Sequence, residues 1–473
     1  MLAVCCTSVF LGNLNNTVLN VALPAMQRDL HSPLSGLQWT TDAYLIALAA
    51  LLMLAGSAGD RLGRRRVFQT GLALFTFGSL LCGLAPGLNW LIACRVLQAV
   101  GASMLNPVAM SIITNTFTEP RERARAIGVW GAVMGVAMAV GPLVGGVLVQ
   151  AAGWRSIFWL NLPIGVAALI CAARFIPESR APHPRRADPV GQLLVIALLG
   201  TLTYAVIEGP STGWTAPLTL GCLVTAPVAL LALLQYERRR TEPLVDLEVF
   251  RDKGFSGAGA MAVLSFFVLG GFLFLNTLYL QNERGLGALD AGLYLLPMAI
   301  LNIVTSQLSG RMTAGLGPRL PLLLAGAATA LGGGLFAAAD AETSNALLFP
   351  AYCLIGAGVG LANTPVTNAA MARIPKERAG VAAAIISTSR QFGQALGVAV
   401  LGAVLTTGLR HSGSISGSGS GAGYVQAVRP AYWIITACGA AIVLLTLLTT
   451  ARRRPPIAPA VTLPERPARE SIT

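Results

Sequence analysis

Long apolar runs recur along the whole chain, and they constrain its fold more than any other feature. A helix needs about 20 predominantly apolar residues to cross the hydrocarbon core of a bilayer, and run after run here reaches that length. Only 11% of the 473 residues are charged, whereas soluble domains carry roughly 25%. A transmembrane β-barrel would instead show short segments of alternating hydrophobicity. The sequence therefore predicts an all-α polytopic membrane protein.

Turn residues divide the apolar runs into fourteen predicted spans. Examples are Pro86-Gly87 and the stretch rich in Ser and Gly at 412–423. The first run has no basic segment before it, so we interpret it as a retained span and not as a cleaved signal. The predicted spans are 2–25, 38–58, 66–85, 90–116, 124–149, 154–175, 190–208, 216–235, 255–280, 288–312, 319–339, 345–371, 380–408 and 431–450.

The basic residues predict the orientation. Of the 33 Lys and Arg, 26 fall in the segments that follow even-numbered spans or in the tail, five in the other loops and two inside spans. Cytoplasmic loops of membrane proteins are enriched in Lys and Arg. We therefore expect a multi-pass protein of the cell membrane with both termini in the cytoplasm. Orientation, rather than nucleic-acid binding, then accounts for the net charge of +13.

Two internal repeats suggest a duplicated unit. "GSAGDRLGRR" at 56–65 is similar to "GRMTAGLGPR" at 310–319, and "PRERA" at 120–124 to "PKERA" at 375–379, at nearly one offset. The matching loops coincide if spans 1–6 repeat as spans 9–14. We expect an N-terminal six-helix bundle at 1–180, an inserted helix pair with its linkers at 181–250, a C-terminal six-helix bundle at 251–451, and a disordered tail at 452–473.

Several motifs resemble those of the major facilitator superfamily, in particular its fourteen-span drug:proton antiporters. "GDRLGRRR" resembles the loop between spans 2 and 3, "RVLQAVGAS" the span-4 motif and "VGPLVGG" the span-5 motif of antiporters. "WRSIFWLNLPIG", "IEGPSTGW" and "RQFGQALGVAV" are also similar to that subfamily. The resemblance implies the major facilitator fold, two six-helix bundles plus a central inserted pair, that rock about a midplane cavity.

The loop after the second span has a role that the resemblance implies. Family members use it as a latch that holds one half against the other. Asp60 is the only acid among four arginines and can accept charge-assisted hydrogen bonds, while an orientation signal alone would need neither the acid nor the glycines. A solvated orientation signal remains the alternative. The latch residues would be Gly56, Asp60, Arg61, Gly63, Arg64 and Arg65.

The fifth span is rich in glycine around a proline. Small residues four apart let helices approach closely, and Pro142 interrupts the backbone ladder. A tight contact between the halves at this motif would seal the protein against proton leak, although plain helix packing is the alternative. The antiporter motif comprises Gly141, Pro142, Gly145 and Gly146.

Asp42 is the clearest acid inside a predicted span. Ionised carboxylates cost about 2.5–3.5 kcal/mol at a helix centre and are usually functional. Arg95 in the fourth span is expected at a similar depth, so a change in their separation would change the proton affinity of the carboxylate. We therefore predict proton coupling by Asp42 and Arg95. A helix cap is the alternative, because "TTD" at 40–42 opens a span.

Polar residues in other spans are candidates for the substrate cavity. Asn15 stands where the subfamily commonly has Asp. Because an amide cannot bind and release a proton, we assign the proton-binding role to Asp42 instead. The asparagines can bind substrate or only pack helices together, and Arg390 can line a cavity or fix a helix pair. The predicted cavity residues are Asn15, Asn16, Glu208, Arg390 and Gln394.

The predicted function is export of hydrophobic or amphipathic small molecules in exchange for protons. The chain shows no GxxxxGK[ST] loop for ATP, no ligand spacing among its eight cysteines, and no nucleophile elbow, so we expect a transporter without cofactor or metal. We also expect a monomer. Proton-linked uptake of a small metabolite is the alternative transport direction, and a receptor or enzyme is the alternative class.

Overall fold

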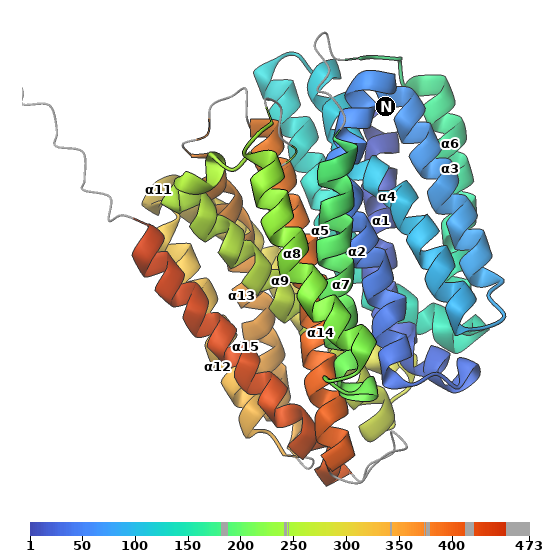
Figure 1. Cartoon of the computed structure of the whole chain (residues 1–473), viewed down its shortest axis with the longest axis vertical. Helices are drawn as coiled ribbons and strands as arrows, with labels where there is room; N and C mark the ends of the chain where they lie inside the picture. The colour runs from blue at the N-terminus through green and yellow to red at the C-terminus, as the bar shows by residue number, and fades with distance from the viewer. Residues whose placement is uncertain are drawn as a thin grey trace, which may run out of the picture.

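Helices make up all the regular structure that is described. The structure is a computed structural model, and it describes residues 1–180, 188–240, 244, 246–340, 343–372, 374, 379–411 and 421–450 (Figure 1). The elements are α1 (Leu2–Leu30), α2 (Leu34–Leu62), α3 (Arg64–Gly83), α4 (Leu88–Thr116), α5 (Pro120–Ala152), α6 (Ser156–Phe175), α7 (Pro189–Thr212), α8 (Pro217–Glu237), η1 (Val249–Arg251), α9 (Lys253–Leu278), η2 (Tyr279–Glu283), α10 (Ala288–Tyr294), α11 (Leu296–Leu316), α12 (Arg319–Ala338), α13 (Asn345–Met371), α14 (Ala379–His411) and α15 (Gly421–Thr449).

The helices confirm the predicted all-α polytopic fold. Within the described residues, 13 candidate spans are long and apolar enough to cross a membrane. α3 is not among them, but it has 20 residues and packs between α4 and α6, as a spanning helix would. With α3 included, each of the fourteen predicted spans corresponds to a long helix.

Several predicted boundaries are wrong by more than a turn. α2 begins at Leu34 and not at residue 38, and α15 begins at Gly421, ten residues before the predicted start. The predicted span 288–312 is divided at Leu295 into α10 and α11. A 29-residue helix is roughly 44 Å long, and the apolar core of a bilayer is about 30 Å thick. Apolar runs therefore mark only the middle of such a helix.

Some sequence features lie outside the described residues. These are the "PKERA" repeat apart from its last residue, most of the Ser/Gly-rich stretch, and the tail from residue 451. The end of that Ser/Gly-rich stretch, residues 421–423, is the first turn of α15 and not a loop.

The long helices form two groups that are joined by a hairpin. In the first group α3 packs on α4 and α6, α1 on α5, and α2 on α4; in the second α9 packs on α14, α12 on α15, and α11 on α13. The α7–α8 hairpin lies across the boundary, because α7 contacts both α2 and α14 (Figure 1). The grouping suits the expected six-plus-two-plus-six layout, whose residue boundaries stay a prediction.

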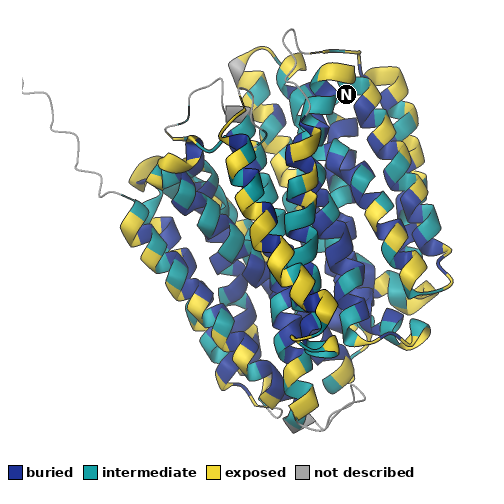
Figure 2. Cartoon of the chain, viewed as in Figure 1, coloured by how far each residue is buried: buried dark blue, intermediate teal, exposed yellow. Residues whose placement is uncertain are grey.

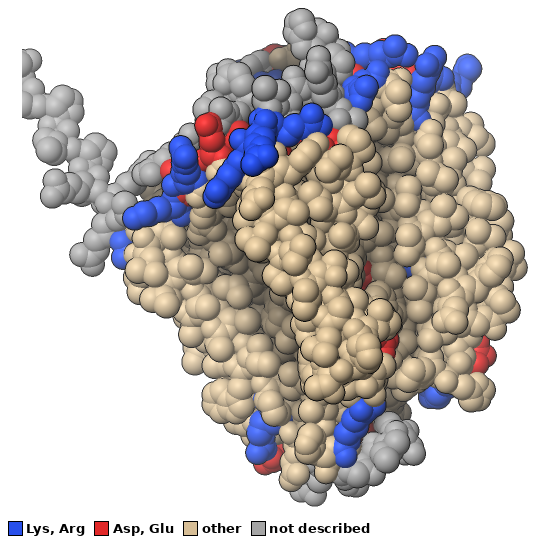
Figure 3. Space-filling model, viewed as in Figure 1, with Lys and Arg blue, Asp and Glu red and all other residues tan. Residues whose placement is uncertain are grey.

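Charge distinguishes the two ends of the molecule. Figure 3 shows Lys and Arg gathered at the end where α2 turns into α3 and α8 ends, which we call the arginine-rich end, with few at the opposite end. The wall between is apolar, and large side chains such as Leu193 (65% exposed) and Val224 (61% exposed) cover its surface. Buried residues concentrate between the helices (Figure 2). This distribution suits a bundle that is surrounded by lipid.

Candidate functional site

Asp42 is completely buried in the second helix. Its side chain is 0% exposed, and neither carboxylate oxygen has a hydrogen-bond partner in the described part of the chain. The residue lies about two turns inside α2, which begins at Leu34. A capping carboxylate would lie at the helix start and accept a hydrogen bond from a backbone N–H there. Asp42 does not lie at the start of α2, and its carboxylate accepts no such bond. Its position is therefore that of a buried acid without a partner among the described residues.

Arg95 lies in a buried polar network beside the same stretch of α2. Its Nε donates to the carbonyl oxygen of Thr40 at 3.1 Å, and its Nη1 donates to Oε1 of Gln98 at 2.6 Å. The guanidinium also sits 4.1 Å from the ring centroid of Tyr44, in cation–π geometry. The arginine is 1% exposed, so these groups replace its water.

The network extends from Arg95 to the first, third and sixth helices. Gln98 donates from Nε2 to the Ser79 hydroxyl at 2.7 Å and to Oδ1 of Asn15 at 3.3 Å. Asn161 donates to the same two oxygens, each at 3.4 Å. Asn15 is thus linked to Arg95 through Gln98. It carries no charge to balance the guanidinium.

Asp42 and Arg95 do not face each other. Among the ion pairs of the described residues, none joins these two side chains. Successive helix residues are turned by roughly 100°, so Tyr44, which covers Arg95, lies nearly opposite to Asp42 around α2. The two residues share a depth, as expected, but α2 stands between them.

Asp42 shares its face of α2 with Gln38, one turn earlier. The Gln38 amide donates from Nε2 to the carbonyl oxygens of Val398 and Ala399 in α14, at 3.2 and 3.0 Å. Further along, Thr388 of α14 donates to the carbonyl of Ala49 at 3.4 Å. Because these contacts bracket Asp42, its carboxylate lies at the seam between α2 and α14, which belong to different halves of the protein.

A second glutamine ties the two halves at the same end. Gln281 donates from Nε2 to the carbonyl oxygen of Val21 in α1 at 2.8 Å. It lies in the short π-helix η2 that follows α9, and π-helical turns occur frequently at functional sites. The opposite end of the molecule is therefore held by two amide-to-carbonyl clasps, at α2–α14 and at α1–η2.

The antiporter motif makes the third contact between the halves. A Cβ at Gly141 or Gly145 would meet Thr17 or Val18 of α1, so these glycines let α5 lie against α1. On the other side, Gly146 lies against the backbone of Ala288 and Leu289, and the carbonyl of Pro142 lies against Gly292 in α10. α5 is thus wedged between α1 and α10 without room for a side chain.

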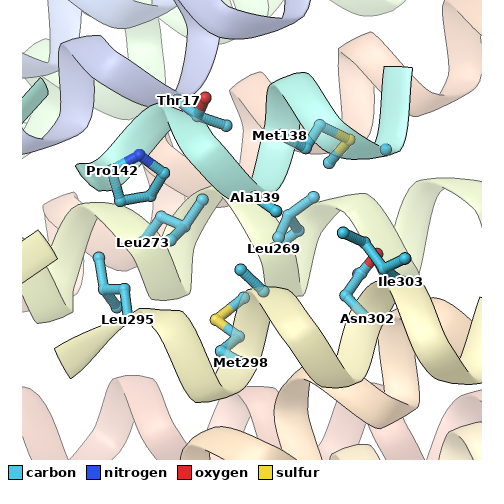
Figure 4. Close-up of a pocket in the computed structure, with 12 residues that line it drawn as sticks. Thr17, Met138, Ala139, Pro142, Leu269, Leu273, Leu295, Met298, Asn302 and Ile303 are labelled. Atoms are coloured by element: carbon cyan, nitrogen blue, oxygen red, sulfur yellow. The ribbon is translucent and has the colours of Figure 1, made fainter. Parts of the chain in front are cut away.

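A narrow hollow lies beside this contact. It has a volume of about 30 Å³ and lies between α5, α9 and α11, with Thr17 of α1 at its edge. Figure 4 shows Met138, Leu273 and Met298 pointing into it, with Asn302 as a polar group. Apart from Asn302 and the Thr17 hydroxyl, its wall is apolar.

The predicted latch loop contacts its own half. Asp60 pairs with Arg64 at 2.8 Å, one turn later, and Gly63 takes a φ of 111° that a side chain would rarely adopt. Glu178, after α6, accepts from the backbone N–H of Arg65 at 3.2 Å and lies 3.7 Å from the Arg66 guanidinium. Gly56 lies where α2 crosses α4 at Pro107. Whether this loop acts as a latch stays a prediction.

The residues predicted for a substrate cavity lie in different places. Arg390 donates to the Thr367 hydroxyl at 2.6 Å and to the Asn363 carbonyl at 3.2 Å, which ties α14 to α13. Gln394 is 7% exposed and packs against Gly270 of α9. Asn16 accepts from Asn20 through its backbone carbonyl at 3.0 Å. Glu208 lines a separate groove at the opposite end.

Sequence reasoning missed the glutamines and the network around Arg95. The missed residues are Gln38, Gln98, Gln281, Ser79 and Asn161. The available signal was an amide within an apolar run, since a buried amide needs partners. The sequence did not indicate which amides reach across to the other half.

Comparison with known proteins identifies close relatives. The family described as Major Facilitator Superfamily matches residues 5–398. The chain is 40% identical to the "Multidrug resistance protein Stp" of Mycobacterium tuberculosis over 85% of this chain and 74% of that protein. It is 36% identical to the "Methylenomycin A resistance protein" of Streptomyces coelicolor (91% and 90% covered), and 35% identical to the "Tetracenomycin C resistance and export protein" of Streptomyces glaucescens (84% and 74% covered).

Solved structures share the fold. A bacterial homologue of the human lysosomal transporter Spinster, inward-facing and unoccupied, aligns with a TM-score of 0.67 at 17% identity, over 95% of this chain and 96% of that one. Tetrameric PepTSo2 aligns with a TM-score of 0.64 at 14% identity, again over 95% and 96%.

Proposed function

Because this chain belongs to the Major Facilitator Superfamily, we propose that it exports hydrophobic or amphipathic small molecules, antibiotics among them, in exchange for protons by alternating access. The observation that carries the proposal is the buried, unpartnered carboxylate of Asp42 at the α2–α14 seam. The names of the relatives, which are resistance and export proteins, support the direction of transport.

The seam gives Asp42 a physical route to coupling. In the closed arrangement Gln38, one turn away, binds α14 carbonyls and Asp42 is dry. If α2 moves away from α14, Gln38 loses its acceptors and water reaches Asp42. The free energy of binding a proton then differs between the closed and open seams, so protonation and seam opening are thermodynamically linked. Arg95 serves in this scheme as a fixed charge behind α2.

The opposite end fits the outer side of the membrane. The arginine-rich end then faces the cytoplasm, as the distribution of Lys and Arg favours. The glutamine clasps and the α5–α10 contact close the outer end, and the cavity would open toward the cytoplasm to take up substrate. We propose that a monomer, divided into the halves 1–180 and 251–451 around the inserted pair 181–250, carries out the cycle.

The proton gradient is sufficient for uphill export. A unit charge that crosses 100 mV releases about 2.3 kcal/mol, which supports a concentration ratio of about 50-fold.

Variants of two carboxylates test the proposal. Cells that express the chain should tolerate methylenomycin A or tetracenomycin C better than cells without it, and a protonophore should remove the difference. Asp42→Asn should abolish the protection at an equal amount of protein in the membrane. Asp340→Asn is the control, because Asp340 is 75% exposed and pairs with Arg429; it should protect as the wild type does.

The direction and the coupling need a purified system. In proteoliposomes with an imposed pH gradient, an internal pH dye should report proton movement opposite to that of the drug, and only in the wild type. Full export by Asp42→Asn, or drug movement in the same direction as protons, would overturn the proposal.

A further inference from the structure

A groove lies between α2, α4 and α7, at the end of the molecule opposite the arginine-rich end and away from the α2–α14 seam. Its volume is about 320 Å³. Pro33, Ser35, Gly36 and Trp39 line it from the α2 side, Leu88, Asn89 and Ile92 from α4, and Glu208 from α7. Pockets of roughly 300–1,000 Å³ hold drug-sized ligands. The groove is therefore large enough for a small organic molecule.

Glu208 brings a negative charge into this groove. Its Oε1 accepts from the Trp39 indole N–H at 2.8 Å and its Oε2 from the Ser211 hydroxyl at 2.7 Å. Both donors are neutral, and no ion pair among the described residues includes Glu208. Arg410 comes close but donates to the carbonyls of Pro210 and Ser211 instead.

Another carboxylate in the chain shows what is missing at Glu208. Asp29 also accepts from an indole N–H, that of Trp154 at 2.9 Å. Arg155 adds its guanidinium at 2.6 Å and neutralises Asp29. Glu208 has the same kind of indole contact without the cation. The cation is the component that the groove lacks.

Aromatic rings stand next to the carboxylate. The rings of Trp39 and Tyr204 are 5.9 Å apart between centroids and tilted by 49°. Cations bind favourably to the faces of such rings. On the α4 side, Val96 follows the lining residue Ile92 by one turn on the same face of the helix and is 40% exposed. An apolar surface thus continues from the groove toward the lipid.

From this combination we propose that the groove binds the cationic group of an amphiphile, with Glu208 as counter-ion and Trp39 as ring contact. The ligand class is an organic cation with an apolar body, and its source is either an exported drug or a lipid that carries an ammonium group. The proposal rests on the proposed function only in taking such cations as cargo. Trp39 adjoins Gln38, so an occupied groove would also contact the helix that carries the α2–α14 clasp.

Equilibrium binding of tetraphenylphosphonium to the full chain in phosphatidylglycerol nanodiscs, whose lipid carries no ammonium group, tests the site without any proton gradient. Glu208→Gln keeps an oxygen for the Trp39 N–H but removes the charge, and should weaken binding at least about tenfold, the factor that corresponds to about 1.4 kcal/mol. Asp29→Asn is the matched control and should bind as the wild type does. Equal affinity with and without the Glu208 charge overturns the proposal.

A local reporter places the ligand. A cysteine at Asn89, which is exposed at the rim, should react more slowly with an impermeant maleimide when tetraphenylphosphonium is present, and Glu208→Gln should remove this protection. A cysteine at Ser344, which precedes α13, should react at the same rate throughout. Protection that persists in Glu208→Gln would also overturn the proposal.

Two further measurements distinguish a lipid from a drug as the ligand, and test whether its binding depends on transport. Adding phosphatidylethanolamine to the nanodiscs should weaken tetraphenylphosphonium binding to the wild type only if the lipid ammonium occupies the same groove. In Glu208→Gln the added lipid should have no effect. Weaker binding to the wild type identifies a lipid as a ligand, and unchanged binding leaves an exported drug as the ligand. Asp42→Asn should bind the probe normally. If the wild type binds the probe normally but shows no proton-driven export, the proposed function alone is overturned.

Discussion

The side-chain amide of Gln38 in α2 donates a 3.0 Å hydrogen bond to the carbonyl of Ala399 in α14, across the boundary between the two helix groups. Backbone carbonyls inside a helix are already engaged, so such a bond adds a second donor to each acceptor. It depends on the close approach of Gly402, where a Cβ would collide with the Gln38 amide. The relationship marks where the halves are held together.

Removing the Gln38 amide should weaken the contact between α2 and α14 at the end opposite the arginine-rich end. Gln38→Leu loses two hydrogen bonds, each worth about 0.5–1.5 kcal/mol. The ratio of closed to open molecules should fall at least about fivefold, the factor for about 1 kcal/mol. Pulsed EPR distances between spin labels at Asn89 and Ser344 report the ratio. Gln192→Leu removes a similar bond between α7 and the Ala50 carbonyl and should leave those distances unchanged.

A side chain at Gly146 should break the seal between α5 and α10. The Cβ would overlap the backbone of Ala288 and Leu289, and overpacking of this kind costs about 1–3 kcal/mol. Gly146→Val should therefore increase the passive proton leak of proteoliposomes. Gly128→Val changes the same helix where nothing lies within 4 Å. An equal leak from both variants would contradict a sealing role for the motif.

Gln98 should matter for stability, because it joins Arg95 to the other helices. Gln98→Leu leaves the guanidinium without its 2.6 Å acceptor and removes the 2.7 Å donor to Ser79, which keeps only the longer bond from Asn161. An unsatisfied buried polar group costs about 1–3 kcal/mol, more when it is charged. The midpoint of thermal unfolding in detergent should therefore fall, because the folded state loses this amount of stability. Gln150→Leu, at an exposed position of α5, should have little effect; unchanged unfolding of both would refute the importance of the network.

Asn15 offers a gain-of-function test. Asn15→Asp puts a carboxylate 3.3–3.5 Å from the Gln98 amide that binds Arg95. We expect a second exchangeable proton and a higher ratio of protons to drug in proteoliposomes. Asn20→Asp introduces the same group where the nearest bond is to the Asn16 carbonyl, and should not raise the ratio. Equal ratios in all three proteins would show that the network does not take part in coupling.

The sequence by itself determined the class of the fold. Apolar runs of bilayer length leave few structures other than membrane-spanning helices, since every backbone N–H and C=O must be paired within the segment. The resemblance of "GDRLGRRR" and "VGPLVGG" to family motifs identified the superfamily, which the comparisons confirm. Asp42 was recognised because an acid inside an apolar run is costly, whichever neighbours it has.

Only the tertiary structure decided which faces meet. The sequence placed Asp42 and Arg95 at one depth, but the turn of α2 puts Tyr44 and Arg95 on one side and Asp42 on the other. How α2 is turned about its own axis depends on its packing against α4, α14 and α7 together, and the sequence of a single span does not contain that information. For the same reason Glu208 was grouped with cavity residues, whereas the folded chain places it in a separate groove beside Trp39, at the end opposite the arginine-rich end.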